Sequence, residues 1–560
     1  MSNTMGDELR INLKKEFKLL KKNWNWIVLI LIIILGTYFR VYHIDYPAIG
    51  YHNWKEVHYL TEARNFAKDG FFKYGFFIPT YDYFLGREGP EGEHPDSFPT
   101  TSILVGIVFK LFGTSLVGAR LVSIIFSLGT IIVMYLLAKK LFGREDYALI
   151  VAFITATSPL LIFFGRQVQL EPIALFFMVL TGYFFLKWKE NPTMRNIVLT
   201  SASFALAFLP RYDHFTIIVP ILFIFPYKKL LEKKLWKQFA VAIIILLTIP
   251  AWLLYTKIVG DRLDTTIVPE GIQPSLLFNS AWWTPIQAYL RDNYTMFGVW
   301  LAVIGLVFLI FFFYKNRNQS NRFLLGFAIS IIPWVIISAK YLKGHAYHQY
   351  PGAPIFILFE AFAILSISST IGGFVKKKYR PYISYTISLL ILATLLFGFG
   401  IVEGEIAAKN RVFDTQFVGL DIAGRYILEN SQPTERILHP GHQIYGVMWH
   451  SNRKGLKIPK SVEEVMEKEA EGANWVFIYQ WGFSIPQKYP DVWSYVTQNY
   501  ELKQIAFQNV GQTSTPIYFL LKRGGSFNES NLNVMIQNKP TFSQEYEFTR
   551  GKQIINYINI

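Results

Sequence analysis

Carboxylates and histidines gather in the stretch of chain that follows the first hydrophobic segment. This stretch reads Gly50-Tyr-His-Asn-Trp-Lys-Glu-Val-His-Tyr59 and continues through Glu88, Glu91, Glu93, His94 and Asp96. Carboxylates and imidazoles are side chains that exchange protons with substrates and bind metal ions. Proton transfer or metal chemistry is therefore the chemistry that these residue types favour.

Residues Trp54 to Phe66 within this stretch show a helical pattern that begins after Gly50 and ends before Gly70. A helix with an aromatic side can lie in the membrane interface. Glu56 is then a candidate general base, because a carboxylate beside lipid tends to have a raised pKa. The alternative is that these acids belong to a solvated loop.

A second segment places Arg166 and Glu171 on either side of an apolar stretch. An ionisable pair near the hydrocarbon boundary is a functional-site hypothesis by default. A structural salt bridge is the alternative.

A third segment runs from Lys340 to Pro351 and contains two lysines, two histidines and several tyrosines. Cationic and aromatic groups of this kind can bind a phosphate. His345 and His348 have a spacing that suits metal ligation in a helix, but Gly344 and Pro351 disfavour a helix there.

The elements that must position these segments are membrane spans. Residues are 52% hydrophobic, and many apolar runs are long enough, or nearly so, to cross a hydrocarbon core of about 30 Å. The segment 100–112 is apolar but short, so we predict a juxtamembrane or re-entrant helix there. The predicted spans are 24–42, 119–138, 147–164, 172–187, 195–209, 213–226, 238–255, 296–314, 323–339, 351–369 and 382–402.

The distribution of lysine and arginine predicts the direction of the spans. Alternate connections between spans, beginning with 139–146, carry 18 Lys/Arg, and the other four connections, beginning with 165–171, carry 7. Cytoplasmic loops carry the excess, so we predict that residues 1–23 are cytoplasmic. The loop 43–118 and the chain after 402 then face outward.

Spans 195–209 and 213–226 are too short for a full crossing at 1.5 Å per residue. Their shared outer turn, Pro210-Arg-Tyr-Asp-His214, would then lie below the membrane surface. A misplaced boundary is the alternative.

The tail from 405 to 560 changes character and predicts an extracytoplasmic α/β domain. Amphipathic helix patterns at Val418–Leu428 and Val462–Glu471 alternate with strand-like runs. These runs are Arg436–His439, Trp475–Tyr479, Leu502–Phe507 and Ile517–Leu521. The predicted division is a transmembrane domain over 24–404 and this α/β domain over 405–560.

The placement of charge argues against nucleic-acid binding, and the absence of cysteine excludes cysteine chemistry. A net charge of +16 alone suggests a nucleic-acid binder, but its placement in cytoplasmic loops is explained by topology and lipid headgroups. The chain contains no cysteine, so neither a disulfide framework nor a thiol nucleophile is possible.

The order of these motifs resembles the polyprenyl-phosphate-dependent membrane glycosyltransferases of the GT-C fold. The branch it resembles most holds the protein O-mannosyltransferases and the lipid A aminoarabinose transferases. The matching motifs, spread over about residues 25–405, are Phe39-Arg40, Lys55-Glu56-Val-His-Tyr59 with Ala63-Arg64-Asn65, Glu93-His94-Pro95, Phe109-Lys110-Leu-Phe-Gly113, Ala119-Arg120, Ser158-Pro159 before Arg166 and Glu171, and His348-Gln-Tyr350-Pro351.

The chain departs from the family pattern at the residue that is usually the catalytic aspartate. Lys55 stands at that position, so the role of base passes to Glu56, with His52 as the alternative. A lysine there could offset phosphate charge. The family's basic phosphate contact is His94 here, a weaker and pH-dependent cation.

The resemblance implies transfer of a sugar from a polyprenyl or dolichyl phosphate to an extracytoplasmic acceptor, by an integral protein of the plasma membrane. Glu171 would orient the acceptor or base, or hold a metal. A divalent metal could bind at Glu93, His94 and His348. The candidate phosphate contacts are Lys55, His94, Arg166, Arg211, Lys340, His348 and Tyr350.

Two other functions are open at this point. A transporter or flippase for lipid-linked sugars would carry ionisable groups deep inside broken helices, whereas most charges here lie at span ends. A binding domain with a membrane anchor would not need eleven spans.

Overall fold

The computed structural model describes residues 24–73, 75–76, 97–262, 272–397, 405–413, 415–440, 446–479, 485–510, 513–548 and 551–560. The chain divides into two compact units. The first comprises Met1–Tyr42, Ser123–Trp252 and Val268–Lys409, and the second comprises His43–Val122, Leu253–Ile267 and Asn410–Ile560.

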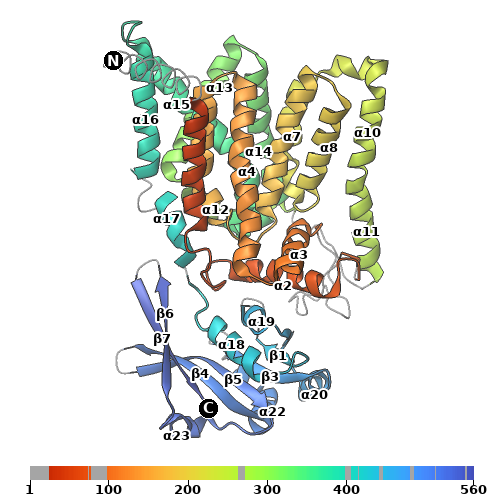
Figure 1. The fold of residues 1–560 in the computed structure, drawn as a ribbon, viewed down its shortest axis with the longest axis vertical. Coiled ribbons are helices and arrows are strands. Elements are labelled where there is room, and N and C mark those ends of the chain that lie inside the picture. Colours follow the sequence, from red (N-terminus) through yellow and green to blue (C-terminus); the bar gives the residue numbers. More distant parts are fainter. Residues whose placement is uncertain are drawn as a thin grey trace, which may run out of the picture. The chain divides into compact units, whose positions relative to one another are not determined.

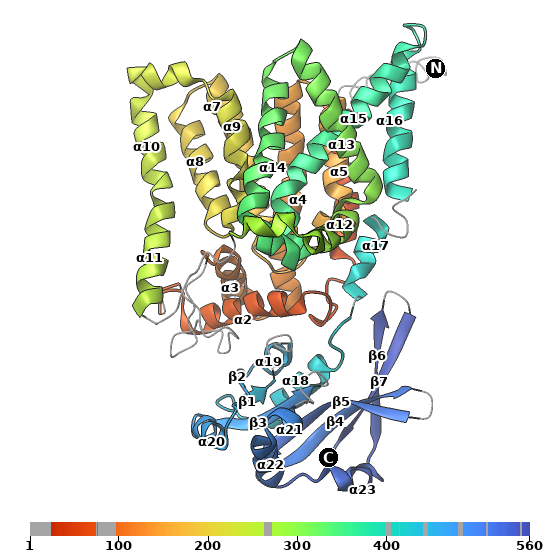
Figure 2. The same cartoon turned by 180° about the vertical axis from the view of Figure 1, so that it is seen from behind.

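The first unit is built of helices (Figures 1 and 2). They are Trp24–Val41, α4 (Leu116–Phe142, which begins in the second unit), α5 (Glu145–Thr157), α6 (Pro159–Phe163), α7 (Glu171–Glu190), α8 (Met194–Phe208), η1 (Tyr212–Ile217), α9 (Ile218–Ile224), α10 (Trp236–Leu246), α11 (Thr248–Arg262, which ends in the second unit), α12 (Ser280–Tyr294), α13 (Met296–Lys315), α14 (Gln319–Gly344), η5 (Ala346–Gly352), α15 (Ala353–Gly373), α16 (Arg380–Phe397) and α17 (Glu405–Asn410).

The lengths of these helices confirm a mainly helical membrane protein. Within the described residues, eight helices are long and apolar enough to cross a membrane. Met194–Phe208 and Tyr212–Ile224 are shorter apolar helices, as predicted for the spans around the Pro210–His214 turn. The predicted span 147–164 is divided into α5 and α6, so the total of eleven spans stays a prediction.

The division between α5 and α6 is caused by Pro159 and capped by an arginine. Proline has no N–H, so the carbonyl of Thr155 loses its helical partner. The fully buried Arg40 donates to the carbonyls of Thr155 and Ala156 at 3.4 and 2.9 Å, and to the Ser127 hydroxyl of α4 at 2.8 Å. One guanidinium thus joins the first span, α4 and the broken helix.

The second unit contains the two predicted interfacial helices, α2 (Asn53–Asp69) and α3 (Thr100–Phe112). Helix α2 ends at Gly70, which has a positive φ of 95° and donates its N–H to the Phe66 carbonyl. Gly106 of α3 lies so close to α2 that a Cβ there would stand 3.0 Å from the Ala63 carbonyl. Glycine at this position therefore lets the two helices touch.

The same unit contains a seven-stranded sheet in the order β2-β1-β3-β5-β4-β7-β6. Strand β1 pairs in parallel with β2 and β3, and the other pairs are antiparallel. The strands are β1 (Arg436–His439), β2 (Lys454–Lys457), β3 (Ala473–Tyr479), β4 (Tyr500–Val510), β5 (Thr513–Arg523), β6 (Thr541–Phe548) and β7 (Gly551–Asn559).

Helices on this sheet include α18 (Leu420–Asn430), α19 (Gly446–Ser451), α20 (Val462–Ala470) and α22 (Pro490–Asn499). The predicted C-terminal α/β fold is therefore confirmed. Buried side chains such as Leu438, Val476 and Leu521 form its core, as a cysteine-free domain requires.

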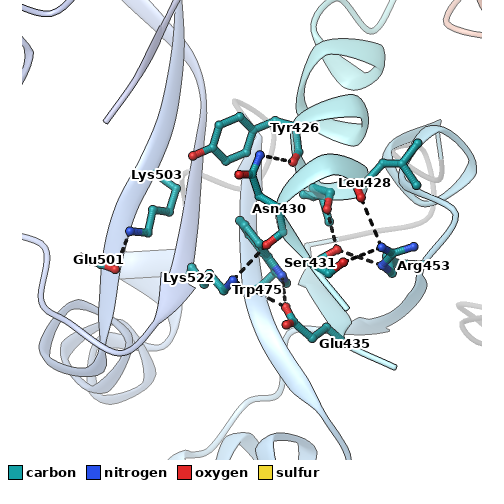
Figure 3. Close-up of polar contacts among 11 residues, drawn as sticks. Tyr426, Leu428, Asn430, Ser431, Glu435, Arg453, Trp475, Glu501, Lys503 and Lys522 are labelled. Atoms are coloured by element: carbon teal, nitrogen blue, oxygen red, sulfur yellow. Dashed lines mark hydrogen bonds and ion pairs between the residues drawn. The ribbon is translucent and has the colours of Figure 1, made fainter. Parts of the chain in front are cut away.

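The C-terminal end of α18 is capped by side chains (Figure 3). Arg453 donates to the carbonyls of Leu428 and Ser431, at 3.3 and 2.7 Å. Lys522 donates to the carbonyl of Asn430 at 3.0 Å and lies 4.8 Å from the centre of the Trp475 ring. These donors satisfy carbonyls that a helix end leaves without partners.

Replacing Arg40 by leucine should destabilise the first unit by about 2–4 kcal/mol, because it leaves buried carbonyls and a hydroxyl without donors. Thermal unfolding in detergent measures the loss. Arg195→Leu, at an exposed position, is the matched control and should change stability little. Equal stabilities for the two variants would contradict the capping role.

Candidate active site

Three of the predicted residues lie at the start of α2. His52 is the N-cap residue, with a left-handed backbone (φ 57°). Lys55 and Glu56 follow in the first turn, and all three side chains are buried. The structure therefore gathers the predicted base candidates at one helix end within the second unit.

Glu56 makes a two-point ion pair with Arg120 near the start of α4. The Nε–Oε1 and Nη2–Oε2 distances are 2.9 and 2.8 Å. Arg120 also donates to the carbonyls of Ile44 and Tyr46, at 2.8 and 2.6 Å. Both carboxylate oxygens therefore accept hydrogen bonds from the guanidinium. The pair ties α2 to the loop before it, and this geometry suits positioning better than proton uptake.

A second polar group on α2 was not singled out from the sequence. His58 Nε2 lies 3.0 Å from Glu62 Oε1, and the Ser102 hydroxyl of α3 donates to Glu62 Oε2 at 2.6 Å. All three residues are buried. The His58–Glu62 spacing of four residues is the signal that could have found this pair, whereas the serine is 40 positions away.

In the first unit, Glu171 at the start of α7 and Arg211 just before η1 come together. Glu171 lies in the first turn of α7 with no exposed surface, and its Oε1 is 3.6 Å from Arg211 Nε. Arg211 also contacts Asp213 at 2.7 Å, and Asp213 contacts His214 Nδ1 at 2.9 Å. The short turn that we predicted to be recessed thus joins an ionic network in which Glu171 and His214 are buried and Arg211 and Asp213 are partly exposed.

His348 joins this network as a neutral imidazole. Arg211 Nη2 lies 2.8 Å from His348 Nδ1. A guanidinium has no acceptor atom, so Nδ1 must accept and the proton must sit on Nε2. His348 can therefore offer an N–H to a phosphate, but not the positive charge that we had expected of it.

The remaining predicted contacts of the first unit differ in burial. Tyr350 is 1% exposed, and its hydroxyl has no hydrogen-bond partner among the described residues. Arg166 is buried and donates to the Tyr42 carbonyl. Lys340 is exposed on α14. The structure thus brings Glu171, Arg211 and His348 into one network, whereas Lys340 has an exposed side chain.

Two of the three predicted metal ligands are not among the residues that the structure describes. Glu93 and His94 lie outside the described residues. Among the residues that are described, no three His, Asp or Glu side chains form a group able to hold a metal. His348 uses Nδ1 for Arg211.

Asp213 and His214 are candidate functional residues that were named only as part of a turn. His214 is fully buried, and in the described structure its Nε2 has no hydrogen-bond partner. The signal in the sequence was the shortness of the two flanking spans. Their connection to Glu171 and His348 depends on tertiary packing.

Comparison with known proteins gives a family match over part of the chain and a shared fold. Residues 93–255 match the family described as dolichyl-phosphate-mannose-protein mannosyltransferase. A protein of Aquifex aeolicus (strain VF5), described as uncharacterized, is 23% identical over 384 residues, which cover 66% of this chain and 68% of that protein.

Two solved structures share the fold. ArnT from Cupriavidus metallidurans, bound to undecaprenyl phosphate, matches with a TM-score of 0.55 and 12% identity over 89% of this chain and 98% of ArnT. The mycobacterial arabinofuranosyltransferase AftD matches with a TM-score of 0.52 and 12% identity, over 93% of this chain and 41% of AftD. These matches confirm the fold that the sequence motifs predicted.

Replacing His348 tests the hydrogen bond to Arg211. In His348→Asn the side-chain oxygen can take the place of Nδ1, so stability should stay near that of the natural chain. In His348→Leu the acceptor is lost, and stability should fall by about 1–3 kcal/mol. Thermal unfolding of both variants measures the difference, and an asparagine variant as unstable as the leucine variant would contradict the assigned tautomer.

Proposed function

We propose that this chain, an integral membrane glycosyltransferase of the GT-C fold, moves a sugar from a polyprenyl or dolichyl phosphate to an acceptor outside the cytoplasm. The observation that carries the proposal is the fold shared with ArnT, whose structure holds undecaprenyl phosphate, over 89% of this chain. The family matched by residues 93–255 takes its name from a mannosyl transfer that uses dolichyl phosphate. The acceptor class is a protein, lipid or glycan.

The donor phosphate needs hydrogen-bond donors and positive charge in a place that excludes water. Arg211 is partly exposed and already oriented by Asp213 and Glu171. His348 can add its Nε2–H, and Tyr350 has a buried hydroxyl to donate. We assign these three residues of the first unit to the phosphate.

Four further residues complete the proposed phosphate contacts. They are Lys55, His94, Arg166 and Lys340, of which His94 lies outside the described residues. Lys55 stands at the first turn of α2, where a cation offsets the charge of a phosphate.

The transfer itself is a displacement at the anomeric carbon. The acceptor oxygen or nitrogen forms a bond to that carbon, and the bond from the carbon to the phosphate oxygen breaks. The phosphate leaves with the electron pair, and a base takes the acceptor proton. Because Glu56 is held by Arg120 at both oxygens, we propose that it positions α2, with His52 as the proton acceptor on this loop. Glu171 orients the acceptor.

The proposed orientation follows the lysine and arginine bias. Residues 1–23 are then cytoplasmic, and the loop 43–118 and the α/β domain of 405–560 face outward at the plasma membrane. The outward domain would contact the acceptor.

The purified chain in lipid vesicles should transfer radiolabelled sugar from a polyprenyl phosphate to an acceptor fraction. Tyr350→Phe should raise the KM for the donor about tenfold, since one hydrogen bond to a charged group is lost. Tyr314→Phe, at an exposed tyrosine of α13, is the control. Movement of labelled lipid between leaflets without product would support the transporter alternative instead.

Glutamine variants of the Glu56–Arg120 pair separate positioning from base catalysis. If the pair positions α2, then Glu56→Gln should lower transfer no more than Arg120→Gln, because the arginine variant also loses the contacts with the Ile44 and Tyr46 carbonyls. If Glu56 were the base, its loss would cost about 10²–10⁴-fold, well beyond that of Arg120→Gln. Rates of transfer at saturating donor measure both.

A further inference from the structure

The α/β part of the second unit holds helix α2 at both of its ends. Before the helix, Ile49 accepts hydrogen bonds from the backbone N–H groups of Gln416 and Phe417, both at 3.1 Å. Gly50 forms an isolated β-bridge with Thr415. These backbone contacts fix the point at which the chain enters α2.

The second attachment, toward the other end of α2, is made by one tryptophan of α19. Arg64 Nη1 donates to the Trp449 carbonyl at 3.1 Å, and the Arg64 guanidinium lies 5.3 Å from the centre of the Trp449 ring. The ring also stacks against Phe109 of α3, with centroids 6.2 Å apart. Trp449 thus contacts α2 and α3 at once.

Arg64 is a buried cation whose contacts in the described part of the chain are with uncharged groups. Its exposed fraction is 9%, and its partners are the carbonyl and ring of Trp449. Burial, followed by the nearby charge of Arg453, lowers the pKa of Arg64 to about 10. A cation in such a place depends on the ring face for stabilisation, so the contact is sensitive to the aromatic side chain.

Helix α19 is itself held rigidly. A Cβ on Gly424 of α18 would stand 2.5 Å from the Cβ of His450, so α18 and α19 pack at a distance that only glycine allows. The Arg453 cap then ties α18 to the strand that follows α19. Displacement of α2 is therefore resisted by the α/β fold.

We propose that Trp449, through Arg64, is a positioning residue for transfer, which sets the place of the α2 residues Lys55 and Glu56. The inference rests on the proposed function. It gives the α/β domain a part in the chemistry in addition to contact with the acceptor. Because misplacing a reactive group by about 1 Å can cost on the order of 10²-fold in rate, loss of the contact should lower kcat more than it changes the donor KM.

The test uses the full chain in lipid vesicles with Trp449 replaced by alanine, phenylalanine or leucine. Trp449→Ala should lower kcat by about 10–100-fold with little change in donor KM. It should also speed amide hydrogen exchange in residues 53–69. Trp449→Phe keeps a ring over Arg64 and should restore both readouts, whereas Trp449→Leu should not. Arg64→Gln removes the guanidinium that contacts Trp449 from the α2 side. If Trp449→Ala does not fold, this variant is measured in its place.

Trp493→Ala is the matched control, because Trp493 packs against the α/β core. The proposal would be overturned if amide hydrogen exchange in α2 were as fast in Trp493→Ala as in Trp449→Ala. It would also be overturned if Trp449→Leu restored kcat and slow exchange. Exchange readouts do not need substrate. If the natural chain makes no product, the proposed function fails, while hydrogen exchange still decides whether Trp449 holds α2.

Discussion

The helical unit depends on a single buried guanidinium at the end of the first span. Water cannot satisfy a broken helix inside a bilayer, so every carbonyl released by Pro159 must find a donor within the protein. Arg40 supplies that donor to α5 and holds Ser127 of α4 with its remaining nitrogen. The turn that carries Arg166 and leads to Glu171 follows α6, so the cap helps to position the network of Glu171, Arg211 and His348.

Arginine performs the same task elsewhere in the chain. Arg120 binds two loop carbonyls while it pairs with Glu56, and Arg453 closes the end of α18. Its planar fork of five N–H donors can bond several oxygens at fixed angles. A residue that resembles a catalytic or phosphate-binding cation in the sequence can therefore connect structural elements. Arg166, a proposed phosphate contact that donates to the Tyr42 carbonyl, is an example.

The sequence predicted the features that depend on residues close together in the chain. Hydropathy located the helices, Gly70 marked the end of α2, and the shortness of 195–209 and 213–226 was confirmed in α8 and α9. Strands β6 and β7 were missed because their side chains are mostly polar and little buried. Of the candidate site, the participation of Glu171, Arg211 and His348 was predicted, but the partners were not. The pairing of Glu56 with Arg120 joins residues that are 64 positions apart in the chain. The contact that fixes the tautomer of His348 joins residues that are 137 positions apart.

These contacts change the meaning of the lysine at position 55. Arg120 neutralises Glu56, so the first turn of α2 has a cation and no carboxylate with a free charge. A helix N-terminus adds its own partial positive charge. Both terms favour the binding of an anion at this turn. We therefore propose that the first turn of α2 contacts the phosphate of the donor through Lys55. Because both Glu56 oxygens are bonded to Arg120, His52 is the proton acceptor that we propose to test first.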